Sequence, residues 1–321
     1  MKVAFHSSYL GYRGTEIALM DYAQGNQGIL CNESLFLMPW RADGERHPVV
    51  ERMKRIAPLR VYRSEQERED ILKEERVDFF YCIKNGFNDG VYSKKVSTGI
   101  HAIFRESEFH GDIYGYVSAW LSEAMAYGHA PWVPHMVRLA EDDGNLREQI
   151  GIPKNAIVFG RHGGDDSFDI PWVHQVVVEI ARKRPDIWFL FLNTRKITGA
   201  LGLSNIRFLP ATADPLAKRK YLNTCSAMLH GRTRGETFGL SCLEFAMVNK
   251  PVLTYGNSPE RAHLEILGDA AVRYQNTAEL RKLLLECVDG GGLGRPSSKS
   301  STWAEYQPEA VMKKFEQVFL R

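Results

Sequence analysis

Two glutamates with seven residues between them are the side chains of this sequence whose types and spacing point most directly to chemistry. Between Glu236 and Glu244, a predicted loop passes into a predicted helix at Phe238, Gly239 and Leu240. The first backbone N–H groups of a helix lack internal partners, and the helix dipole makes that end positive, so a diphosphate binds there readily. Glycine lets the backbone approach such a ligand closely.

Carboxylates on both sides of a diphosphate site suit the recognition of hydroxyl groups. Each carboxylate accepts two or more O–H donors, such as those of sugar and ribose rings. We therefore expect Glu236 and Glu244 to meet hydroxyls at opposite ends of one nucleotide sugar. The residues also allow a plainer interpretation, in which Ser241 and Glu244 form a capping box and Glu244 only satisfies backbone donors.

Strands and helices alternate along the whole chain around this turn. Residues 156–160 and the continuous apolar run 187–192 predict strands, and the apolar stripe of residues 172–183 predicts a helix between them. Strands separated by helices imply parallel sheets with right-handed crossovers. The fold class predicted is therefore α/β.

The length of the chain predicts two domains, because 321 residues exceed what one hydrophobic core usually serves. Prolines and an acidic turn between residues 131 and 155 mark the boundary. We expect one Rossmann-like domain over residues 1–133 and a second over 134–307. An amphipathic helix over 308–321 is expected to pack back toward the first domain. Two such domains facing across a cleft form a natural small-molecule site.

The segment from Glu236 to Glu244 resembles the E-x7-E signature of the retaining GT-B glycosyltransferases, especially the family 4 group. It follows a predicted strand and precedes Lys250-Pro251-Val252, as in that family. The resemblance implies the GT-B fold, with residues 1–133 as the domain on the acceptor side and residues 134–307 as the domain that binds the nucleotide sugar. It also implies that Glu236 is catalytic and contacts hydroxyls of the transferred sugar, that Glu244 contacts the ribose, and that the turn between them offers backbone to the diphosphate.

Two further glycine and arginine positions are similar to the family pattern. Gly14, in Tyr12-Arg-Gly-Thr-Glu, resembles a loop whose backbone approaches the donor phosphates. Arg161 ends a predicted strand as the family's Gly-Arg does, and by that resemblance it pairs with a phosphate oxygen, for which a forked guanidinium is well suited. A surface salt bridge is the alternative for Arg161.

The family usually places a Lys-Gly shortly after that arginine, and this chain has an Asp-rich stretch at 163–169 instead. Arg232 and Arg234, just before Glu236, are expected to supply the missing positive charge, with Arg234 as a donor-binding residue. Glu260, where the family places a loop over the sugar, is expected to be an ordinary exposed carboxylate.

The candidate in the first half is His101, in Thr98-Gly-Ile-His. It resembles a strand-end histidine on the acceptor side of the cleft and is interpreted as catalytic by that resemblance. His110 is its rival. A histidine taken alone is more often structural than catalytic, so a packing role stays open for both.

The resemblance implies transfer of a sugar from a nucleotide-diphosphate sugar to an acceptor hydroxyl, with retention and without a metal or another cofactor. The acceptor is a glycan, a lipid-linked molecule or a small molecule. Two alternatives stay open: an epimerase or phosphorylase on the same fold, and a transferase-like protein that binds nucleotide sugar without turnover. The sugar, the nucleotide and the acceptor are not readable from the sequence.

Bulk properties limit the other partners and the compartment. Forty-one basic residues balance 39 acidic ones, so no nucleic-acid partner is expected. The five cysteines form no C-x-x-C pair, which favours a reducing compartment. No apolar run approaches a membrane span, and basic residues between 52 and 68 alternate with glutamates, so membrane contact is at most peripheral. We expect a cytoplasmic protein.

Overall fold

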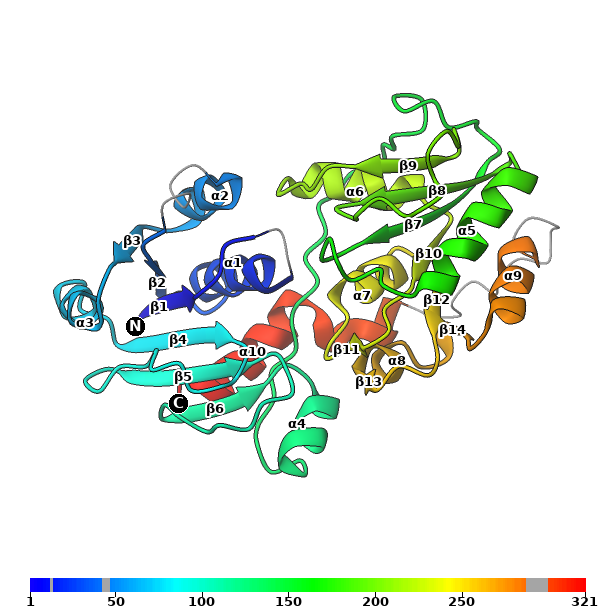
Figure 1. Ribbon diagram of the computed structural model, residues 1–321. Helices are drawn as coiled ribbons and strands as arrows, with labels where there is room; N and C mark the ends of the chain where they lie inside the picture. Colours follow the sequence, from blue (N-terminus) through cyan, green and yellow to red (C-terminus); the bar gives the residue numbers. More distant parts are fainter. Residues whose placement is uncertain (12–13, 42–46, 287–299) are drawn as a thin grey trace. The chain divides into compact units, whose positions relative to one another are not determined.

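The computed structural model describes residues 1–11, 14–41, 47–286 and 300–321 (Figure 1). The chain divides into two compact units. The first contains Met1–Arg138 and Ala304–Arg321, and the second contains Leu139–Trp303. The chain thus changes unit after residues 138 and 303, whereas the sequence placed these changes after 133 and 307.

The first unit is built on a parallel sheet, and the α/β class is confirmed there. Among the described residues its six strands have the order β3-β2-β1-β4-β5-β6. The strands are β1 (Lys2–Ser7), β2 (Glu33–Pro39), β3 (Leu59–Tyr62), β4 (Phe79–Lys84), β5 (Ser97–Ala102) and β6 (Ile113–Tyr116). The helices are α1 (Gly14–Gly28), α2 (Pro48–Ile56), α3 (Glu65–Glu74), α4 (Ala119–Ala126) and α10 (Pro308–Phe319). The short η3 (Ser300–Tyr306) precedes α10.

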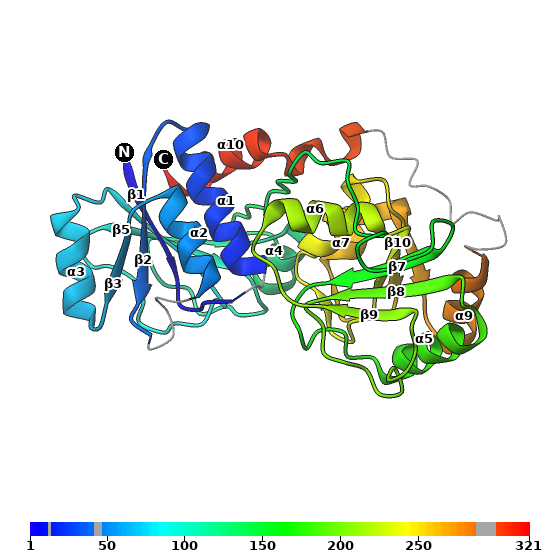
Figure 2. The same ribbon diagram turned by 90° about the horizontal axis from the view of Figure 1, so that it is seen from above.

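The last helix of the chain, α10, lies beside α1 in the first unit (Figure 2). Its Phe315 is fully buried against Phe5 and Tyr22. Gly25 of α1 allows the close approach, because a Cβ there would lie 2.5 Å from Cγ of Met312. Burial of this apolar face is what holds the end of the chain on the first unit.

The second unit repeats the scheme with the strand order β14-β12-β10-β7-β8-β9 among the described residues, again all parallel. The strands are β7 (Ile157–His162), β8 (Ile187–Leu192), β9 (Ile206–Leu209), β10 (Ala227–His230), β12 (Val252–Tyr255) and β14 (Ala271–Tyr274). A two-stranded parallel sheet pairs β11 (Gly235–Glu236) with β13 (Glu260–Arg261). The helices are α5 (Pro171–Lys183), α6 (Pro215–Thr224), α7 (Leu240–Met247), α8 (Ala262–Leu267) and α9 (Thr277–Glu286), with the short η2 (Gly268–Ala270) after α8.

Helices cover both faces of the second sheet, with α5 and α9 on one side and α6 and α7 on the other (Figure 1). Phe159 belongs to the apolar cluster under α5 and α9. A Cβ on the next residue, Gly160, would meet Tyr221 of α6 and Phe245 of α7. Because side chains alternate across a strand, these two neighbours show a layer of helices on each face. This is the Rossmann-like arrangement that the alternating pattern predicts.

Local signals explain where α6 begins, and that helix contributes to the site described below. The Asp214 side chain accepts the N–H of Leu216, and Pro215 stands at the first helical position. An acidic N-cap followed by proline is a favoured helix start. Helices long and apolar enough to cross a bilayer do not occur in the described ranges of the chain.

Candidate functional site

The turn that starts α7 depends on one glycine. Gly239 is the N-cap of α7 and has a left-handed backbone with φ 93° and ψ 50°. A Cβ at this position would lie 2.6 Å from Cβ of His263. Both the conformation and the crowding require glycine. The cap makes no side-chain hydrogen bond, so the first N–H groups of α7 lack the usual capping partner.

Glu244 lies just after the first turn of α7, is buried, and is held by two basic side chains. Lys218 of α6 donates to Oε1, and Nε2 of His162, at the end of β7, lies 3.1 Å from Oε2. Burial alone would raise the pKa of Glu244, but Lys218 and then His162 outweigh it and lower the pKa to about 2. The carboxylate is therefore ionised. Because the N-cap is Gly239 rather than Ser241, the capping-box interpretation is not realised.

Glu236, on β11, is the second carboxylate beside this turn, and 19% of its side chain is exposed. Nη1 of Arg232 donates to Oε2 at 2.7 Å, and Nε2 of His230 lies 3.2 Å from Oε1. Burial would raise the pKa of Glu236, but Arg232 and His230 lower it to about 2. Glu236 is thus an ionised acceptor that solvent reaches, whereas Glu244 is enclosed.

A chain of hydrogen bonds extends from Glu236 into the interior of the second unit. Nδ1 of His230 lies 2.9 Å from Oγ1 of Thr254, and that oxygen lies 3.0 Å from Nε2 of His263. The carboxylate can only accept, so a neutral His230 carries its hydrogen on Nε2. Its Nδ1 then accepts from the Thr254 hydroxyl, which accepts in turn from Nε2–H of His263. Burial, followed by the nearby His230, lowers the pKa of His263 to about 3, in agreement with a neutral ring.

Arg161 is placed at the end of β7 as expected, but its guanidinium is occupied by the protein. It donates to the carbonyl oxygens of Asn193 and Gly164, at 3.2 and 2.7 Å, and to the hydroxyls of Thr194 and Ser167, at 2.6 and 2.5 Å. The side chain is 3% exposed, and burial lowers its pKa to about 10. In this structure Arg161 braces the loop after β7, and it is not a surface salt bridge.

The other charged positions near the turn are also paired. Nε of Arg234 donates to Oε1 of Glu260 at 2.5 Å, and Glu260 is 1% exposed. The expectation that Glu260 is an exposed carboxylate is therefore wrong, because the pairing of β13 with β11 brings it inside. In the Asp-rich loop, Asp165 pairs with Arg195 at 2.9 Å.

The first unit holds the two remaining candidates, His101 and Gly14. His101 is fully buried in β5, where Nδ1 lies 2.6 Å from the Tyr81 hydroxyl and Nε2 lies 2.9 Å from the Val133 carbonyl. Burial lowers its pKa to about 4. Both ring nitrogens are hydrogen-bonded within the core of the first unit, and these contacts support a packing role rather than the catalytic one. Gly14 is exposed and opens α1.

The structure therefore brings together Glu236, Phe238, Gly239, Leu240 and Glu244 around the start of α7, with Arg234 beside them. Sequence reasoning missed Lys218, His162, Thr254 and His263. Lys218 lies in a mixed polar helix, and the others lie on strands or a short helix without a motif. No local signal in the sequence marks these residues, because their contacts join distant segments. Lys218 and His162 contact Glu244, whereas Thr254 and His263 connect to Glu236 through His230.

Comparison with known proteins establishes the fold of the chain. No protein-family model and no curated protein matches the sequence. Among solved structures it is similar to Anabaena HepE in complex with UDP and glucose, with a TM-score of 0.71 and 14% identity over 99% of this chain and 98% of that one. It is also similar to a glycosyltransferase from Rickettsia africae, with a TM-score of 0.72 and 12% identity over 99% and 97% of the two chains.

A third similar structure is a putative UDP-N-acetylglucosamine 2-epimerase from Listeria monocytogenes, with a TM-score of 0.63 and 14% identity over 97% of this chain and 94% of that one. These likenesses, together with the two parallel sheets, show that the chain has the GT-B fold of glycosyltransferases. The GT-B prediction is confirmed at the level of the fold.

Proposed function

We propose that the protein is a glycosyltransferase that moves a sugar from a nucleotide-diphosphate sugar to an acceptor hydroxyl. The second unit binds the donor on this proposal. The observation that carries it is the start of α7, where N–H groups without a capping side chain lie beside the ionised and partly exposed Glu236. The binding of UDP and glucose by HepE, which shares the fold, supports the same ligand class.

On this proposal, each part of the donor is bound by a different feature of the site. The diphosphate lies on the backbone of Phe238, Gly239 and Leu240, where the positive helix end stabilises the charge that grows on the leaving phosphate. Glu236 accepts hydrogen bonds from hydroxyls of the sugar, and Arg232 keeps that carboxylate ionised. Glu244, beside Lys218, serves the ribose. We extend the proposal to retention of configuration, transfer without a metal and a cytoplasmic location.

A panel of UDP-, GDP- and dTDP-sugars tested by thermal shift examines this proposal. A bound donor raises the apparent melting temperature by mass action. We expect one nucleotide class to stabilise the protein and Glu236→Gln to reduce the shift for the whole sugar more than the shift for the free nucleoside diphosphate. If no member of the panel stabilises the protein, the proposal fails.

An epimerase is the second candidate, because the Listeria protein similar to this chain is a putative epimerase. Incubation of the stabilising donor without an acceptor separates the two reactions. An epimerase converts the sugar to its epimer without an acceptor, whereas a glycosyltransferase gives a new glycoside only when an acceptor is present. A protein that binds nucleotide sugar without turnover gives neither product.

A further inference from the structure

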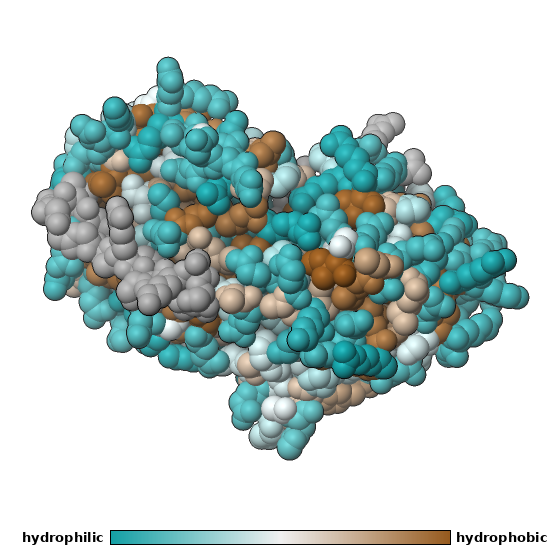
Figure 3. Space-filling model, turned by 180° about the vertical axis from the view of Figure 1, so that it is seen from behind, coloured by the Kyte–Doolittle hydropathy of each residue, from teal (hydrophilic) through white to brown (hydrophobic). Residues whose placement is uncertain are grey.

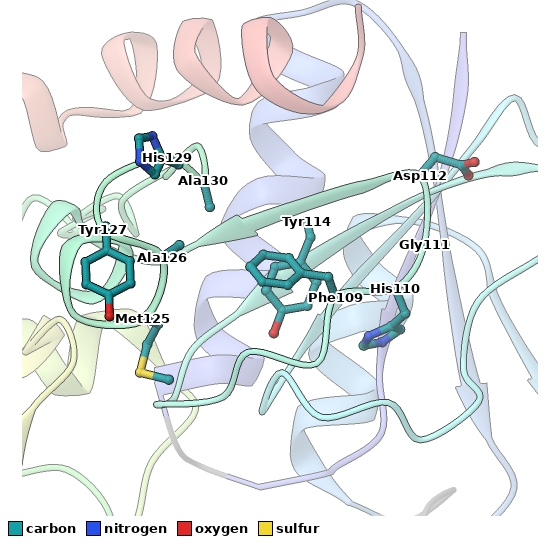
Figure 4. A pocket seen from close by; sticks show the side chains of 10 residues that line it. All are labelled: Phe109, His110, Gly111, Asp112, Tyr114, Met125, Ala126, Tyr127, His129 and Ala130. Carbon is teal, nitrogen blue, oxygen red and sulfur yellow. The ribbon is translucent and has the colours of Figure 1, made fainter.

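A pocket of about 630 Å³ lies in the first unit, beside the edge strand β6 (Figure 4). Its wall consists of residues 109–112 of the loop before β6, Tyr114 of that strand, and residues 125–127, 129 and 130 at and just after the end of α4. Figure 4 shows His110 and Asp112 on one side and Tyr127 on the other, with Phe109 and Tyr114 between them. The volume lies in the range of small-molecule sites.

Tyr127, in this wall, has a backbone conformation that is unfavourable for tyrosine. It caps the C-terminus of α4 with φ 49° and ψ 37°, a left-handed position that glycine or asparagine normally occupies. Gly128, with φ 73°, follows it. The Tyr127 side chain is 84% exposed, so packing offsets little of this backbone strain. A strained and exposed aromatic residue in a pocket wall indicates a function other than folding.

Phe109 offers a second aromatic surface in the same pocket. It is 59% exposed, and its ring centroid lies 4.8 Å from that of Tyr114. Figure 3 shows one face of the molecule, on which apolar residues form several brown patches among hydrophilic ones. Two exposed aromatic rings that line the same pocket differ from a single exposed apolar residue, which surfaces normally carry.

Two polar side chains of the pocket, those of His110 and Asp112, present hydrogen-bond acceptors. Nδ1 of His110 lies 2.6 Å from the Glu108 carbonyl oxygen, so the ring hydrogen is on Nδ1 and Nε2 keeps its lone pair. That Nε2 is buried and has no hydrogen-bond partner in the described part of the chain. Burial also lowers the pKa of His110, which keeps the ring neutral. Asp112 adds an exposed carboxylate, of which Oδ2 accepts the N–H of Thr98 at 2.7 Å.

We infer that this pocket binds a saccharide. A sugar ring presents an apolar C–H face to aromatic rings and a rim of O–H donors, and the pocket offers Tyr127 and Phe109 to the first and His110 and Asp112 to the second. None of the lining residues is lysine or arginine, so an anionic ligand finds no counter-charge here. The role of the pocket as a seat for part of a glycan acceptor rests on the proposed function, whereas the binding itself does not.

Saturation-transfer NMR with maltotriose, cellotriose and chitotriose tests the inference on the full chain without any donor. We expect at least one trisaccharide to bind. Tyr127→Asn should weaken its binding about tenfold, because the variant loses one aromatic stacking contact with the sugar. Because asparagine tolerates the left-handed backbone, the same variant should melt at a higher temperature than the wild type. Trp40→Ala, which removes another half-exposed aromatic side chain of the first unit outside the pocket, should bind as the wild type does.

The inference is overturned if no trisaccharide binds, or if Tyr127→Asn binds as tightly as the wild type. It is also overturned if choline chloride or a nonionic detergent binds to the pocket and none of the trisaccharides does. The thermal shift with the panel of UDP-, GDP- and dTDP-sugars, measured on the same samples, keeps the two proposals apart. Its absence with every member contradicts the donor site alone, and its presence in Tyr127→Asn shows that only the saccharide pocket was damaged.

Discussion

The two units use a strand-end histidine on equivalent parallel sheets in different ways. His101 of β5 and His230 of β10 are both buried, yet the hydrogen bonds of His101 to Tyr81 and Val133 stay within the core. His230 contacts Glu236, because the loop after β10 leads into β11, which carries that carboxylate. A polar residue at a strand end thus becomes part of a site only when the following loop brings a charged group back to it.

The largest effect is expected from Gly239→Ala, which disrupts the turn at the start of α7 beside Glu236. The left-handed backbone costs about 2 kcal/mol in a residue with a side chain, and the clash with His263 adds to this. We expect loss of donor binding and a lower unfolding free energy, measured by denaturant titration. Gly202→Ala is the control, since Gly202 has φ 84° but nothing within 4 Å of an added Cβ. Equal losses in the two variants would show that crowding at His263 is unimportant.

Glu236→Gln tests whether the carboxylate that His230 contacts takes part in the reaction. Removal of the charge takes away an acceptor for the hydroxyls of the sugar, and we expect transfer to fall about a hundredfold, in the range of other preorganised polar groups. Steady-state kinetics with the stabilising donor and an acceptor measures it. A variant with unchanged kcat and KM would remove Glu236 from the site.

Substitution of each histidine by leucine tests directly whether His101 serves stability and His230 serves activity. His101→Leu leaves the Tyr81 hydroxyl and the Val133 carbonyl without a partner, so the unfolding free energy should fall by about 2 kcal/mol with little change in kcat of the folded fraction. His230→Leu should lower kcat through Glu236. The reverse pattern in melting and kinetics would assign the site to the first unit.

Acid should destabilise the fold through its buried histidines. The pKa values of His6, His101 and His263 are lowered to about 3, 4 and 3, so between about pH 6.5 and 4 the unfolded chain binds more protons than the native one. Stability is therefore present above pH 6.5 and is lost as the pH falls. His101→Leu should flatten this dependence by at most about 1.4 kcal/mol per pH unit. An unchanged slope of unfolding free energy against pH would contradict the neutral core histidine.

The smallest effect is expected at Thr254, which contacts Glu236 only through His230. Thr254→Val breaks the bridge between His230 and His263, and we expect kcat to fall several-fold while KM for the donor changes little. Thr254→Ser keeps the hydroxyl and should restore kcat. If the valine and serine variants have the same kcat, the hydroxyl does not position Glu236.

Local patterns in the sequence were enough to predict the fold and the glycine turn at the start of α7. The apolar run of β8 and the stripe of α5 follow from periodicity, and Gly239 with its flanking glutamates follows from what a helix start requires. Long-range pairing was not readable. The contact of Lys218 with Glu244 joins two helices, and the burial of Glu260 depends on a two-residue sheet. The strand context that suggested chemistry for His101 is also what buries it.

A crystal structure of the protein soaked with a nucleotide sugar tests the central claim most directly. We predict the diphosphate at the start of α7, within hydrogen-bond reach of the backbone N–H groups at Gly239 and Leu240, with Glu236 on a sugar hydroxyl. A donor bound elsewhere, with that turn empty and Glu236 still paired only with Arg232 and His230, would contradict the account.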